Sequence, residues 1–153
     1  MTADQPTVAS MDALGTFTLR YDQTSEVLLE DCRVPASNLL GDGTVRVTGG
    51  STTFDGAFGF AGHVETTSGS ATVGVAAAVA SATLSAGGDL TFDAGVAVSG
   101  ALSVTGSGAV LTLDAPSTAG SLVQSNGTIR RPDASSSGTL DVAGSFAWSG
   151  GGI

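Results

Sequence analysis

The sequence predicts an all-β protein, built as a parallel β-solenoid with a short N-terminal extension or cap. Three observations predict it. Pairs of apolar residues flank single small residues, as a strand with one buried face requires. The first three pairs start only six residues apart, which leaves no room for a strand and a hairpin turn. Glycines recur near the joints, where a tight corner needs a residue without a side chain. The apolar residues are Leu90/Phe92, Val96/Val98, Leu102/Val104, Leu111/Leu113, Leu140/Val142 and Phe146/Trp148, with Leu122 and Ile129 as single positions.

Strands this short are not stable alone. We therefore expect coils of roughly 18 to 21 residues, with three strand faces a coil and inward ladders of Leu, Val and Phe. An antiparallel β-sandwich is the alternative, because it also uses short alternating strands. Between Gly87 and Trp148 the only Asn-Gly or Asp-Gly dipeptide is Asn126-Gly127. Tight hairpins favour such dipeptides, so their scarcity favours the solenoid.

Taken in order, the chain begins with a polar stretch, residues 1–15, without the basic flank and apolar segment of a secretory signal peptide. Strands are expected at Phe17 to Leu19 and at Val27 to Leu29. We divide the chain into an N-terminal segment, 1–43, and solenoid repeats, 44–153. The repeats stop without a polar capping segment, so we expect the solenoid to be truncated at its C-terminus.

The first coils are expected between Val45 and Val75, where the alternation is present but irregular. The stretch from Val73 to Leu84 is rich in alanine and carries no charge. A membrane span needs about 20 strongly apolar residues, and Ser, Thr and Gly dilute this stretch. We expect no membrane span here, and instead a buried strand or a short helix.

The run GGDLTFDAGVAVSGALSVTGSGAVLTLDAP, followed by GTIRRP and GTLDVAGSFAWSGGG, carries this repeat most clearly. It resembles the repetitive β-solenoid segments of large secreted bacterial surface and adhesin-like proteins, and the likeness extends more loosely over residues 44–153. The resemblance implies an extracellular or cell-surface location in the parent protein and a structural, non-catalytic role. It names no ligand.

Residues 24–43, TSEVLLEDCRVPASNLLGDG, resemble a different family, the acyl-CoA dehydrogenases. In that family a Glu-Val strand, an acidic pair, a Val-Pro turn and Asn-Leu-Leu-Gly occur together near the end of the middle β domain. A long helical domain with the catalytic carboxylate would follow there, whereas this chain continues into Thr44-Val45-Arg46-Val47. The resemblance implies a chimera or fragment, and an alternative function as a flavoprotein fragment without catalytic residues.

The charge and composition of the chain limit the classes of molecule that it is expected to bind. The chain has 14 acidic residues, five arginines and no lysine, and its net charge is −9. Binding to nucleic acid needs a basic footprint, so we expect no nucleic-acid partner. The single cysteine, Cys32, excludes an internal disulfide and is expected to behave as a small apolar residue.

Two groups of residues could suggest catalysis or metal binding. His63 is the only histidine, and Ser51 and Asp55 lie near it in sequence, but no nucleophile motif accompanies them, so we expect no triad. Asp89 and Asp93 flank Leu90-Thr91-Phe92 and should point outward together. Calcium needs six to eight oxygen ligands, and the repeat signature Gly-Gly-x-Gly-x-Asp is only partly met here, so we expect a solvated face.

The basic pair Arg130-Arg131, followed by Pro132-Asp133, suggests a β-helix polysaccharide lyase as a second alternative function. A loop that leaves the solenoid at Pro132 explains the same residues. Asn126-Gly127-Thr128 fits a glycosylation acceptor but is expected to be a turn.

We therefore predict a non-catalytic structural or adhesin-like module, with no catalytic, cofactor-binding or metal-binding residues and no cofactor. The last coil, at Phe146 and Trp148, should expose apolar area and strand edges, so we also expect self-association through open solenoid ends.

Overall fold

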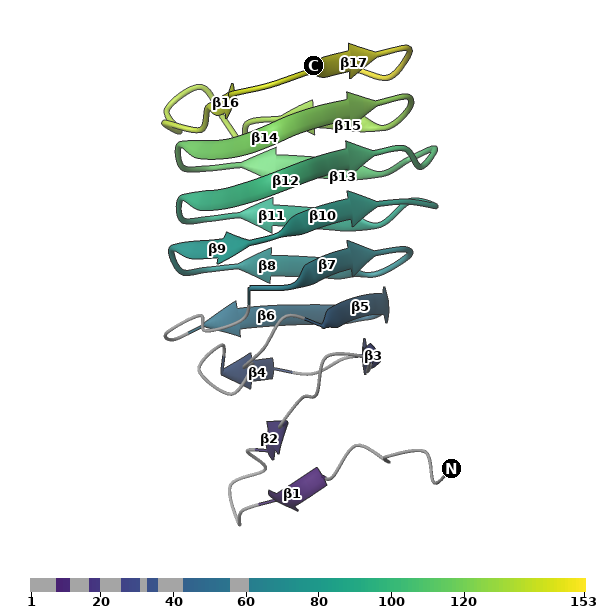
Figure 1. Ribbon diagram of the computed structural model, residues 1–153, viewed down its shortest axis with the longest axis vertical. Coiled ribbons are helices and arrows are strands. Elements are labelled where there is room, and N and C mark those ends of the chain that lie inside the picture. The colour runs from purple at the N-terminus through teal and green to yellow at the C-terminus, as the bar shows by residue number, and fades with distance from the viewer. Residues whose placement is uncertain (1–7, 12–16, 20–25, 31–32, 36–42, 56–60) are drawn as a thin grey trace.

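The computed structural model describes residues 8–11, 17–19, 26–30, 33–35, 43–55 and 61–153, and the regular structure in these ranges is entirely β. The strands stack as a parallel β-solenoid of about 5 turns (Figure 1). The predicted fold class is confirmed. The sandwich alternative is wrong, because among the described strands only β1 (Val8–Met11) and β2 (Phe17–Leu19) pair antiparallel.

Two parallel sheets form the walls of the solenoid. The larger sheet contains β3 (Glu26–Glu30), β5 (Thr44–Gly49), β7 (His63–Thr66), β9 (Ala77–Val79), β10 (Ser81–Leu84), β12 (Val96–Val104), β14 (Ser117–Gln124), β16 (Leu140–Val142) and β17 (Phe146–Trp148). The smaller sheet contains β4 (Arg33–Pro35), β6 (Ser51–Asp55), β8 (Ser70–Val73), β11 (Asp89–Phe92), β13 (Val110–Leu113) and β15 (Thr128–Arg130).

The larger sheet is bent, so each central coil has the three strand faces that the sequence predicts. The first half of β12 pairs with β9 and its second half with β10. The pairing of β12 with β14 shifts in register between Val98 and Ala101, at the corner between the two halves. Leu102 pairs with Ala82 and with Leu122, so one coil is 20 residues long here. The last coil is longer, because Leu122 pairs with Phe146 and the loop 131–139 lies between them.

The core is a set of inward columns that run through the stacked coils. The three pairs Leu90/Phe92, Val96/Val98 and Leu102/Val104 are at most 2% exposed, as the sequence predicts. Leu111, Leu113, Leu122 and Ile129 are also buried. Because the strands are parallel and in register, each inward side chain packs on the equivalent side chain of the next coil. Burial of one such Leu or Val stabilises the fold by roughly 1.5 to 3 kcal/mol.

Four inward positions among the described residues are polar. Thr52, Thr66 and Gln124 are fully buried within the columns, and Ser117 is 3% exposed. Gln124 donates from Nε2 to the carbonyl oxygen of Gly152 at 2.8 Å, while its Oε1 atom has no hydrogen-bond partner. The hydroxyls of Thr52 and Thr66 are likewise unpaired. Each unpaired buried oxygen costs on the order of 1 to 3 kcal/mol, so these coils are less stable than purely apolar ones.

Glycines at the corners let one coil lie directly on the backbone of the previous coil. A Cβ atom added at Gly100 would lie 2.7 Å from the carbonyl oxygen of Ala80, and one at Gly106 would collide with the backbone of Ser85 and Ala86. Glycine is required at these corners by the close approach of neighbouring coils.

The outward positions of the smaller sheet also form columns. Thr53, Thr72, Thr91 and Thr112 are equivalent residues of β6, β8, β11 and β13. Parallel strands lie about 4.8 Å apart, so four threonine side chains repeat at that spacing along the outer face.

The alanine-rich stretch from Val73 to Leu84 forms β9 and β10 together with the end of β8, rather than a helix. Val79, Ala82 and Leu84 are buried there, as expected for core strands. No helix among the described residues is long and apolar enough to cross a membrane.

Parallel pairing crosses the predicted boundary at residues 43 and 44. Val27 of β3 pairs with Val45, and Val34 of β4 pairs with Phe54. The backbone of the dehydrogenase-like stretch therefore joins both sheets, while the division of the chain into two segments stays a prediction. Cys32 lies outside the described residues.

Candidate functional site

A polar cluster lies on the outer face of β5, β7 and β10. Arg46 Nε and Glu65 Oε2 form an ion pair at 2.8 Å, and their side chains are 37% and 21% exposed. His63 Nδ1 lies 2.7 Å from Ser81 Oγ, its partner one coil later. The strand register explains the cluster, because His63 and Glu65 alternate outward on β7 and face the neighbouring strands directly.

The surroundings of His63 favour the neutral form of its ring. Burial of the ring lowers the pKa of His63 below the ordinary value of 6.5, and the positive charge of Arg46 lowers it further. Glu65 and a backbone hydrogen bond involving Ser81 raise the pKa, but the net shift is downward. The neutral ring can accept a proton from the Ser81 hydroxyl, so the pair has the contact of a serine–histidine dyad. Nucleophilic catalysis would also need an oriented carboxylate and oxyanion donors.

The residues considered for a triad are distributed over both sheets. Ser51 and Asp55 occupy the two ends of β6 in the smaller sheet, whereas His63 begins β7 in the larger sheet. The serine beside His63 is Ser81, which sequence proximity does not suggest. The expected coil length is the signal that could have identified Ser81. A residue 18 to 21 positions after His63 lies on the equivalent strand of the next coil.

Asp89 and Asp93 are exposed at either end of β11, as the sequence predicts. Phe92 pairs with Leu113, so Asp93 lies one coil from Asp114 at the same corner. In the described ranges, no three His, Cys, Asp or Glu residues gather closely enough to hold a metal ion.

The basic pair lies at the C-terminal end of the solenoid. Arg130 ends β15, where its Nε is 3.5 Å from Thr112 Oγ1, and Arg131 begins the loop that leaves the coil. In that loop Asp133 Oδ1 accepts hydrogen bonds from the Ser135 backbone at 2.7 Å, the Ser135 hydroxyl at 2.5 Å and the Ser136 backbone at 3.0 Å. These bonds, led by that of the Ser135 hydroxyl, hold the pKa of Asp133 below its ordinary value.

Asn126-Gly127-Thr128 lies at the bend between β14 and β15, which confirms the predicted turn. Gly127 has a φ of 71°, a conformation that favours glycine. Asn126 is exposed at this bend.

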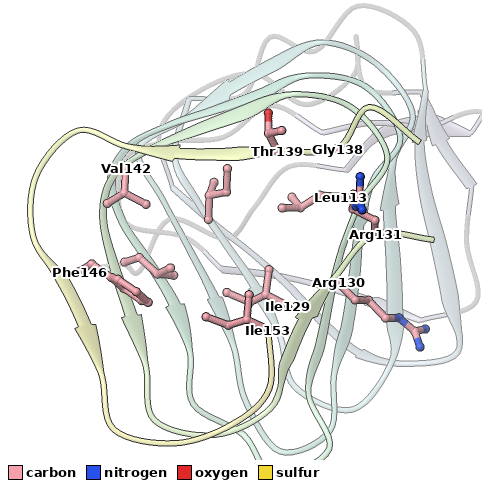
Figure 2. A pocket seen from close by; sticks show the side chains of 11 residues that line it. Leu113, Ile129, Arg130, Arg131, Gly138, Thr139, Val142, Phe146 and Ile153 are labelled. Atoms are coloured by element: carbon pink, nitrogen blue, oxygen red, sulfur yellow. The ribbon is translucent and has the colours of Figure 1, made fainter. Parts of the chain in front are cut away.

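An apolar cavity of about 450 Å³ lies at the open end of the core. Figure 2 looks into it: Val142 and Phe146 line one side, Leu113 and Arg131 lie opposite, and Ile129 and Ile153 lie between. Arg130 points away from the cavity in this view. A second, shallower groove runs over small residues of three successive coils, Ala76–Ala78, Gly95–Ala97 and Pro116–Thr118.

No family model, curated protein or solved structure matches this chain. The resemblances to bacterial surface solenoids and to the acyl-CoA dehydrogenase strand stay predictions.

Proposed function

We propose that the chain is a non-catalytic structural module of a bacterial surface or secreted protein, with an adhesin-like role as a stiff spacer. The observation that supports this role most directly is the continuous set of inward apolar columns. From Val45 in the first coils to Leu122 near the last, each coil packs on the next in the same register. Such stacking favours a rod in which every coil contacts only its neighbours.

The outer faces support the same role. Threonines form one column, and small residues such as Ala78, Ala97 and Thr118 form another. Short side chains in regular columns give a smooth exterior, and the net charge of −9 keeps such a rod from associating through its sides. A spacer needs stiffness along its axis and a solvated exterior.

The proposal is tested by displaying the chain on a cell surface between a membrane anchor and an epitope tag. Wild type should hold the tag clear of the surface layer, where a labelled antibody binds it. Leu102→Asp places a charge in the core and should lower antibody binding severalfold, whereas Ala101→Asp, on the adjacent exposed residue, should leave it unchanged.

Equal antibody binding by the two variants would contradict the spacer role, because it would mean that the intact core is not needed.

The proposed absence of catalysis is tested separately. Purified chain incubated with acidic polysaccharide and calcium should release no unsaturated product, and release that disappears on Arg130→Ala and Arg131→Ala would establish the lyase instead.

A further inference from the structure

The bend between β14 and β15 contains Asn126-Gly127, the only Asn-Gly dipeptide of the chain. In water such a dipeptide can form a cyclic imide, because the backbone nitrogen that follows the asparagine attacks the side-chain amide. Glycine permits this attack, since it has no Cβ atom to hinder its nitrogen. The chain has one other asparagine, Asn38, and the branched Leu39 follows it. Asn126 is therefore the asparagine whose sequence context favours the reaction.

The structure leaves both reacting groups of this dipeptide accessible. The side chain of Asn126 is exposed, and its amide makes no hydrogen bond to any described residue. The N–H groups on either side of Gly127 are bonded, that of Asn126 to Val104 at 3.5 Å and that of Thr128 to Ala109 at 2.8 Å. The N–H of Gly127 itself has no hydrogen-bond partner in the described part of the chain. Neither burial of the amide nor hydrogen bonding within these ranges protects the pair.

The packing of the coils also requires glycine at position 127. Its φ is 71°, and a Cβ atom added there would lie 2.6 Å from the carbonyl oxygen of Ala109 and 2.9 Å from Cγ1 of Val104. A bulkier residue would slow the cyclisation, but it does not fit between these neighbours. The close contact of the coils therefore keeps the reactive dipeptide in place.

We propose that Asn126 is a site of spontaneous deamidation in the native fold. The nitrogen of Gly127 bonds to Cγ of Asn126 and loses its proton, while the side-chain nitrogen leaves as ammonia. Water then hydrolyses the imide at one of its two carbonyls. Opening at Cγ gives aspartate, whereas opening at the backbone carbonyl gives isoaspartate, in which the main chain runs through Cβ and Cγ. Each product adds one negative charge. This modification goes beyond the spacer role and needs no partner enzyme.

The isoaspartate product should disturb the bend, because its main chain is longer by one methylene carbon. The next coil lies directly over this bend. A Cβ atom at Gly151 would lie 2.8 Å from the carbonyl oxygen of Asn126 and would collide with that of Gly127. Beside this contact Gln124 donates to the carbonyl oxygen of Gly152 at 2.8 Å. Since neighbouring backbones leave no space for an extra atom, isoaspartate should loosen the last coil from β14.

Incubation of the full-length chain at mildly alkaline pH without denaturant tests the proposal. Ion-exchange chromatography should resolve more acidic forms that accumulate with time, and the intact mass should show an amide group replaced by a hydroxyl. Hydroxylamine, which attacks the cyclic imide, should cleave the chain into residues 1–126 and 127–153. Asn126→Ser is the control, because it removes the amide from an exposed position, and it should show neither the acidic forms nor the cleavage.

A parallel incubation in urea separates the effect of the fold from that of the dipeptide. Because the native structure leaves both groups accessible, the folded chain should deamidate at a rate within severalfold of that of the unfolded chain. A folded chain that stays unmodified while the unfolded chain reacts would overturn the proposal, since the fold would then protect Asn126. Acidic forms that appear equally in Asn126→Ser would also overturn it, because they would come from another amide.

The two products test the effect on the last coil. Isoaspartate is identified by methylation with an isoaspartyl methyltransferase, and Asn126→Ser gives the background from the Asp-Gly pairs at 42–43 and 55–56. The purified isoaspartate form should unfold at a lower urea concentration than the unmodified chain, as followed by emission of Trp148, which pairs with Gln124. Freshly prepared Asn126→Asp should unfold with the unmodified chain. Equal unfolding of all three would refute the loosening of the last coil.

Discussion

Truncation of Leu102 to alanine measures how much one inward residue contributes to the stacking of coils. Leu102 is fully buried in β12, between Ala82 of the previous coil and Leu122 of the next. The substitution removes three carbon atoms, which at about 0.8 kcal/mol each is roughly 2.4 kcal/mol of transfer free energy. Ala82 is too small to fill the space, so a cavity cost of about 1 kcal/mol or more adds to this. The free energy of unfolding should fall by about 3 to 4 kcal/mol.

Urea titration followed by far-ultraviolet circular dichroism measures this change. Ser103→Ala is the matched control, because Ser103 is the next residue and points outward, so its cost should stay within about 0.5 kcal/mol. Emission from Trp148 in the same titration reports on the last coil. Since a solenoid is stabilised by contacts between neighbouring coils, the two signals should shift together if the coils unfold as one unit.

The reasoning would be refuted by a loss below about 1 kcal/mol for Leu102→Ala, or by an equal loss for Ser103→Ala. Either result would mean that the inward columns do not hold the coils together.

Three further predictions follow from the corner, the polar cluster and the loop. Gly100→Ala should destabilise the fold by about 1 to 3 kcal/mol in urea titration, because the new Cβ would lie 2.7 Å from the carbonyl oxygen of Ala80. Gly74→Ala is the control, because its Cβ would lie 3.6 Å from the nearest carbonyl oxygen, and it should change stability by less than about 1 kcal/mol. The folded state lowers the pKa of His63, so the stability it contributes is complete above pH 6.5 and is lost as pH falls through the folded pKa. His63→Gln should therefore reduce the loss of unfolding free energy between pH 7.5 and 5, and an unchanged slope would count against the account. Ser135→Ala should raise the pKa of Asp133, followed by carboxyl-carbon NMR, and an unaltered titration would show that another group holds the carboxylate ionised.

The coil architecture could be predicted because the local pattern and the tertiary contacts have the same origin. Alternation at Leu90/Phe92 and Leu102/Val104 follows from the strand itself, and in-register stacking then determines which residues meet. The coil length follows from the spacing of these pairs, and glycine at position 100 follows from the close contact of two backbones.

The polar features were harder to predict, since they depend on the register between distant strands. His63 meets Ser81 only because β7 and β10 are adjacent, and a search near His63 in sequence finds Ser51 and Asp55 instead. Gln124 breaks the apolar alternation, and its burial depends on a hydrogen bond to Gly152 in the final coil. The pairing of β3 with β5 also depends on the register between strands, whereas the likeness to an unrelated family suggested only that residues 1–43 form a separate N-terminal segment or cap.

The 20-residue coil around Leu102 has a consequence for how this chain occupies space. One coil advances the axis by about 4.8 Å, or roughly 0.24 Å per residue, compared with 1.5 Å per residue for an α-helix. Most of the polypeptide therefore runs around the solenoid axis and adds little to the length of the molecule. In return, each coil presents a set of outward side chains, and a strand's outward residues can be replaced without altering its inward ones. The outer surface can therefore change in sequence coil by coil, while the length of the solenoid depends only on the number of coils.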